Sequence, residues 1–102
     1  MNSFISTPKN ARTMNLTFDC VSPSELTDFF KLYDTDDDFV AYIGDADCDI
    51  LLNNTYNGKR YIRTYVIQIS LPCDAGQEDQ VLYSNRELEY IRDYIMRRLG
   101  WE

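Results

Sequence analysis

The chain has 102 residues, with 17 Asp and Glu against 10 Lys and Arg, no His, and a formal net charge of −7. That charge opposes direct binding to nucleic-acid phosphates or to anionic membrane surfaces. Hydrophobic residues make up 44% of the chain and aromatic residues 14%, which favours one folded domain over a disordered chain. No long apolar run is present, so we expect no membrane span and a cytoplasmic location.

The N-terminal region predicts a leader followed by a strand. Residues 1–12 contain Pro8 and no periodic apolar pattern, so we expect a flexible leader and a domain over residues 13–102. In the next segment Met14, Leu16, Phe18 and Cys20 alternate with polar residues. This alternation is typical of a half-buried strand.

The next segment predicts a helix. Ser22 and Glu25 flank Pro23 in the pattern of a capping box with proline at the first helical position. An apolar stripe then repeats at helical spacing, through Leu26, Phe29, Phe30 and Tyr33. We expect the Asp-rich run at 34–38 to end this helix. Acids at a helix C-terminus oppose the macrodipole, so helix stability does not explain them.

Two short strands are expected at 39–43 and 49–53, joined by a turn at 44–47. Asn57-Gly58 is a hairpin-turn signal, because both residues accept positive φ. The turn leads into the strongest strand pattern, at 60–71, where apolar and polar residues alternate up to Pro72.

A polar loop at 72–82 precedes a second helix. Ser84 and Glu87 form its capping box, and Gly100 is the expected stop signal. Its buried stripe comprises Leu88, Ile91, Ile95 and Leu99. The order β-α-β-β-β-α predicts a small α+β domain, with a mostly antiparallel sheet of about four strands and two helices packed on one face.

Several classes of site are excluded by residue type. Without His, neither a Ser/His/Asp nor a Cys/His nucleophile can be assembled. The glycines are isolated at turns, so no phosphate-cradling loop is present. Cys20, Cys48 and Cys73 match no metal or redox spacing, which favours buried free thiols. We therefore expect a protein that is not an enzyme and takes no cofactor.

The most unusual segment is YDTDDDFVAYIGDADCD at 33–49, which holds seven Asp and no Lys, Arg or His. Asp34, Asp36 and Asp38 invite comparison with a calcium loop, but Phe39 stands where that loop requires Gly, and Asp45 stands where it requires Glu. A specific metal site is therefore not expected. The run is either a solvated loop, which is common, or an acidic binding surface.

We favour the acidic binding surface, because clustered like charges repel each other and a purely solubilising set would be dispersed. The hypothesis is a non-enzymatic inhibitor that presents a phosphate-like surface to a basic, nucleic-acid-binding protein. In size and composition the chain is similar to small phage-encoded inhibitors of bacterial defence nucleases. The candidate partner-binding residues are Asp34, Asp36, Asp37, Asp38, Asp45, Asp47, Asp49, Tyr33 and Tyr42.

Three alternatives stay open. Immunity proteins that neutralise nuclease toxins share the same small, acidic profile. A second class is an assembly or adaptor domain that docks through an apolar and aromatic surface, through an exposed strand edge or the Tyr90 and Tyr94 side of the last helix. The sequence also leaves homodimerisation open.

Overall fold

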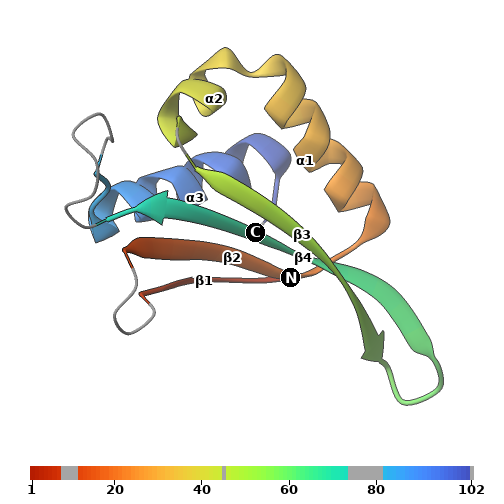
Figure 1. Cartoon of the computed structure of the whole chain (residues 1–102). Coiled ribbons are helices and arrows are strands. Elements are labelled where there is room, and N and C mark those ends of the chain that lie inside the picture. Colours follow the sequence, from red (N-terminus) through yellow and green to blue (C-terminus); the bar gives the residue numbers. More distant parts are fainter. Residues whose placement is uncertain (8–11, 45, 74–81, 102) are drawn as a thin grey trace.

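The computed structural model describes residues 1–7, 12–44, 46–73 and 82–101. In this part of the chain a four-stranded antiparallel sheet carries three helices on one of its faces (Figure 1). The predicted α+β class is confirmed. The elements are β1 (Asn2–Ser6), β2 (Thr13–Val21), α1 (Pro23–Thr35), α2 (Asp37–Ile43), β3 (Asp47–Tyr56), β4 (Tyr61–Pro72) and α3 (Asn85–Leu99).

The core lies between the sheet and the helices. The strand order is β1-β2-β4-β3, and the two central strands bring Leu16 opposite Ile69 and Phe18 opposite Ile67. All four of these side chains are fully buried. The apolar residues that alternate along β2 and β4 therefore share one face of the sheet, and this face lies against the helices. Phe29, Leu88, Ile95 and Trp101 close the core from the other side.

A bulge bends β2 just before α1 begins. Phe18 pairs with Ile67 but Val21 pairs with Tyr65, so β2 holds one extra residue at this point. Cys20 takes the left-handed φ of 56° there, a conformation that is uncommon for residues other than Gly, Asn and Asp. The Asp19 carboxylate accepts a 2.8 Å hydrogen bond from the Cys20 amide, which satisfies a donor that the bulge removes from regular strand pairing.

The expected strand at 39–43 is wrong, because these residues form the helix α2. Asp36 caps the helix, and Phe39 and Ile43, one turn apart, are both buried. A short apolar run fits a strand and a buried helix equally well by periodicity. The placement of the aspartates is corrected with it: Asp37 and Asp38 lie in the first turn of α2, where acids stabilise a helix.

The expected element order is also corrected. Residues 2–6, assigned to the leader from sequence, form β1, which pairs with β2 along its whole length. The observed order is therefore β-β-α-α-β-β-α, with three helices where two were expected. Residues 8–11 of the expected leader and most of the expected loop at 72–82 lie outside the described residues. The boundary of the domain at residue 13 stays a prediction.

Both predicted capping boxes are confirmed. The Ser22 hydroxyl accepts from the Glu25 amide at 3.2 Å, and the Glu25 carboxylate accepts from the Ser22 amide at 2.9 Å. The same reciprocal pair joins Ser84 and Glu87 at the start of α3. Gly100 ends α3 in the left-handed conformation, with φ of 70°, as its place in the sequence predicts.

The β3–β4 hairpin extends beyond the helices (Figure 1). The predicted turn is confirmed, although it spans 57–60 and only Gly58 of the Asn57-Gly58 pair has positive φ. The molecule measures 51 × 32 × 19 Å, with a radius of gyration of 14.4 Å. A compact chain of this length has a radius of gyration of about 12.8 Å, so the projecting hairpin makes the molecule elongated.

Candidate partner-binding surface

Asp36 is a buried carboxylate at the junction of α1 and α2, with 8% of its surface exposed. Its Oδ1 accepts from the Phe39 amide at 3.0 Å. Its Oδ2 accepts from the Tyr94 hydroxyl at 2.8 Å and from Arg98 Nε at 3.1 Å. Both oxygens are therefore used inside the fold, where they tie the α1–α2 junction to α3.

These bonds change the acidity of both partners. The Phe39 amide and then the Tyr94 hydroxyl lower the pKa of Asp36 most, burial opposes them, and Arg98 lowers the pKa further. The hydrogen bond from Tyr94 to Asp36 is the main reason why the pKa of Tyr94 is raised. Asp36 is thus held as an ion by its neighbours, with little surface left to offer a partner.

Asp37 and Asp38 differ from Asp36 in their exposure and in their bonding. Both are exposed in the first turn of α2. Of the described residues, only Asp36 and Asp93 accept a salt bridge, so the charges of Asp37 and Asp38 are not neutralised by a cation within 4 Å in that part of the chain. Their carboxylates are available to a partner.

Tyr42 lies on α2 beside these acids, within a group of tyrosines contributed by two helices. Its ring meets Tyr90 at 5.5 Å and Tyr94 at 5.4 Å, both edge to face. The hydrogen bond with Tyr90, followed by charge repulsion and burial, raises the pKa of Tyr42 to about 12. Its backbone carbonyl accepts from the Tyr83 hydroxyl at 2.8 Å. Tyr42 is therefore a fixed aromatic ring that still presents part of its surface to solvent.

A pocket of about 310 Å³ lies between α1 and the start of β3. Asp34 and Asp47 line it together with Phe30, Cys48 and Ile50. Tyr33 also lines it and packs on Phe29 and Phe39, with ring centroids 6.3 and 5.7 Å apart. Asp34 and Asp47 are both exposed. Asp47 pairs with Ser70, so its carboxylate projects toward the sheet face without helices, and Asp34 is the acid on the α1 side of the pocket.

The candidate residues are therefore only partly brought together. Asp34, Asp37, Asp38 and Asp47 surround the α1–α2 junction and the start of β3, and we call these four the acidic pole. Asp49 pairs with Gln68 and Asp47 with Ser70, so both project from the sheet face without helices; Asp47 is counted with the pole because it is the first residue of β3, whereas Asp49 lies further along the strand. Asp45 lies outside the described residues.

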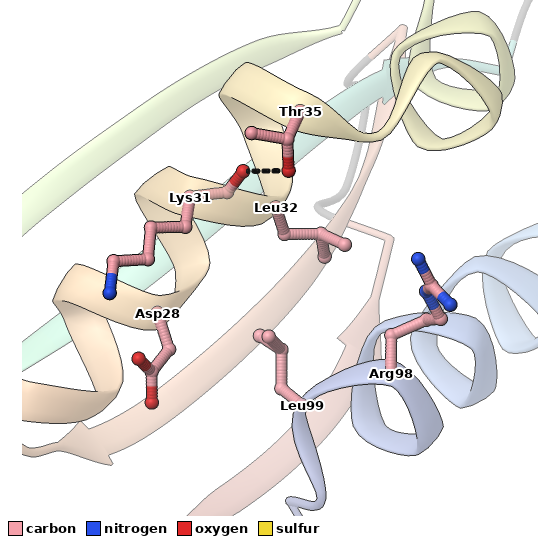
Figure 2. Close-up of a pocket in the computed structure, with 6 residues that line it drawn as sticks. All are labelled: Asp28, Lys31, Leu32, Thr35, Arg98 and Leu99. Atoms are coloured by element: carbon pink, nitrogen blue, oxygen red, sulfur yellow. Dashed lines mark hydrogen bonds between the residues drawn. The ribbon is translucent and has the colours of Figure 1, made fainter.

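A second pocket, of about 300 Å³, lies between α1 and the end of α3 (Figure 2). Leu32 and Leu99 lie between Asp28 and Lys31 on one side and Arg98 on the other. Arg98 is already bonded to Asp36. The remaining pair of opposite charges, Asp28 and Lys31, gives this pocket no preference for an anion or a cation.

Metal binding and thiol reactivity depend on the Cys, Asp and Glu side chains of the described residues. These residues contain no group of three Cys, Asp or Glu side chains placed to hold a metal ion. Burial, followed by the charge of Asp49, raises the pKa of the Cys48 thiol to about 11, which disfavours the reactive thiolate. No helix in the described part of the chain has the length and apolar character needed to cross a membrane.

Comparison with protein-family models, with curated proteins and with solved structures finds no match.

Sequence reasoning missed the residues that organise this surface. Arg98 and Tyr94 bind Asp36 from 62 and 58 positions away, and no local pattern links such distant residues. One local signal existed, because Asp36 stands three residues before Phe39 in N-cap spacing. Tyr90 and Tyr94 are one turn apart on α3, and this spacing lets both rings contact Tyr42.

Proposed function

We propose that this protein is a small, non-enzymatic inhibitor that binds a basic, nucleic-acid-handling protein through the acidic pole. The observation that carries the proposal is the contrast among neighbouring aspartates. Asp36 is bonded inside the fold, whereas Asp37 and Asp38, the next two residues, stay exposed without a cation among the described residues. The internal bonds of Asp36 fix the backbone from which the two exposed carboxylates project.

The proposed mechanism is competition with nucleic acid. Closely spaced carboxylates on a rigid support attract the Lys and Arg side chains that bind phosphates. Tyr42 lies on the same helix as these carboxylates and packs on Tyr90, and both rings are partly exposed. Tyrosine contributes strongly at protein interfaces, because its ring packs while its hydroxyl forms hydrogen bonds. The proposed site of action is the cytoplasm, where the partner would be a bacterial defence nuclease or a nuclease toxin.

The test is affinity capture from a nuclease-treated bacterial lysate, so that nucleic acid cannot bridge two proteins. Wild type is compared with Asp37→Asn/Asp38→Asn and with a matched control, Asp28→Asn/Glu89→Gln, which removes two exposed charges elsewhere. Asp36 is left intact because its loss would disturb the fold.

We expect wild type and the control to retain a basic nucleic-acid-binding protein that the Asp37/Asp38 variant loses. Retention should fall steeply as salt rises, because exposed charges are screened. The purified partner should also lose nucleic-acid binding when wild type is added. Equal capture by all three proteins would rule out the acidic pole as the binding surface.

A second candidate is an assembly or adaptor domain that docks through apolar and aromatic side chains. The observation that favours it is the exposure of Leu51, Leu52, Tyr56 and Tyr61 on the projecting hairpin. Docking through such a surface should change little with salt, which separates the two candidates in the same capture experiment.

A further inference from the structure

The strand β3 leaves one edge of the sheet open. It is last in the order β1-β2-β4-β3, and β4 is its only partner among the described strands. Natural edge strands are commonly protected from pairing by charged residues, prolines or bulges. Residues 50–56 of β3 read ILLNNTY, without a charge or a proline, and no register shift interrupts their pairing with β4. This edge is therefore open to another strand.

The part of the hairpin beyond the helices, residues 51–64, exposes apolar side chains on both of its faces, and we call it the hairpin tip. Leu52 pairs with Tyr65 and Tyr56 with Tyr61, on the side of the sheet that carries the helices. Leu51 lies on the opposite side. Leu51 and Leu52 are 53% and 60% exposed, and Tyr61 is 72% exposed. These side chains lack the cover that the helices give to the rest of the sheet.

The charges of the hairpin tip are opposite to those of the acidic pole. Residues 50–64 contain Lys59, Arg60 and Arg63 and no acid. Asp34 and Asp47 line the apolar pocket at the other end of β3. One strand therefore joins a basic, apolar tip to an acidic, apolar pocket.

We propose that β3 pairs with β3 of a second copy, antiparallel, about a two-fold axis at Leu51 or Leu52. In such a pair, a residue that follows the axis in one copy lies beside the residue that precedes the axis by the same number of positions in the second copy. Tyr56, about five residues beyond the axis, then lies beside Ala46 to Cys48 of the second copy, at the pocket. Lys59 and Arg60 lie near Asp34 and Asp47 of the second copy.

This arrangement is self-complementary, as a two-fold dimer requires. Each tip covers the pocket of the other copy, and the two four-stranded sheets become one continuous sheet. Asp37, Asp38 and Tyr42 lie on α2 and stay outside the interface, so the inference does not depend on the proposed function. Each dimer would present Asp37 and Asp38 twice, facing outward, while Asp34 and Asp47 of the acidic pole would contact the second copy.

The test is sedimentation equilibrium of the full chain, comparing wild type with Leu52→Lys and with Val40→Lys. Leu52 and Val40 are both exposed apolar residues, but Val40 lies on α2, away from the edge. We expect wild type and Val40→Lys to dimerise, and Leu52→Lys to dissociate about tenfold more readily or worse, because a charge enters the apolar centre of the interface twice.

Cysteine trapping then locates the axis. A residue on the two-fold axis of an antiparallel pair faces its own copy at a distance that a disulfide can span. Under mild oxidation either Leu51→Cys or Leu52→Cys should form a disulfide that joins the introduced cysteine of one copy to the same cysteine of the second copy. Val40→Cys should form no such disulfide. A wild-type monomer up to millimolar concentration, or a dimer that Leu52→Lys leaves unchanged and neither axis cysteine traps, would overturn the proposal.

Discussion

Charged side chains are usually exposed and apolar side chains are usually buried, and the regions around the acidic pole and the hairpin tip both depart from this rule. Beneath the pole, the carboxylate of Asp36 is inside, bonded to an amide, a tyrosine and an arginine. At the tip, leucines and tyrosines are outside. A buried charge is costly unless other groups of the same chain pair with it in the folded state. An exposed apolar side chain is available to pack against another protein.

The difference indicates which features serve the fold and which remain for binding. Asp36 stabilises the junction of three helices, so it belongs to the fold although it lies within the most acidic part of the sequence. Leu51 and Leu52 contribute little to the core, although they lie in the most apolar part of β3. Residue type alone would assign these roles the other way round.

The largest expected effect compares the two halves of the hairpin on one side of the sheet. Ile67 is fully buried and Leu52 is largely exposed, and both lie on the side with the helices. Ile67→Ala should lower the free energy of unfolding by about 2–5 kcal/mol, whereas Leu52→Ala should cost less than about 1 kcal/mol. Urea unfolding at low micromolar concentration measures both. Similar costs would contradict the separation into a packed half and an unpacked tip.

The next effect compares neighbouring aspartates. Asp36→Asn weakens the ion pair with Arg98 and forces an amide into the site of a carboxylate that accepts three bonds, so the Tm should fall by about 5–10 °C. Asp37→Asn removes an exposed charge from the first turn of α2 and should lower the Tm by only a few degrees. Thermal denaturation followed by circular dichroism gives both values. A smaller loss for Asp36 than for Asp37 would show that the internal bonds are unimportant.

The smallest effect is a pH dependence that belongs to Asp36. Its pKa in the folded protein lies below the ordinary carboxyl value of 3.8, so its contribution to stability is complete above that value. The contribution is lost as the pH falls through the lower, folded-state pKa. The free energy of unfolding of Asp36→Asn should therefore decline less steeply below about pH 4 than that of wild type. Parallel curves for the two proteins would contradict a lowered pKa.

Local patterns in the sequence were enough to predict the elements that carry their own signals. The reciprocal capping boxes at Ser22 and Ser84 set the starts of α1 and α3, and these bonds form within four residues. The alternation in β2 and β4 predicted the buried side of each strand. Helix and strand periods differ, and over segments of this length the difference is unambiguous.

The sequence by itself therefore determined the α+β class, the starts of two helices, and the acidic character of the segment from 33 to 49. Only the tertiary structure decided that 39–43 is a helix. A short apolar run can bury its side chains as a helix or as a strand, and the choice depends on how the segment packs against the core. It also divided the aspartates, since the role of Asp36 depends on Tyr94 and Arg98, which are distant in sequence. The exposure of Leu51 and Leu52 was decided in the same way, because the helices end before they reach the hairpin tip (Figure 1).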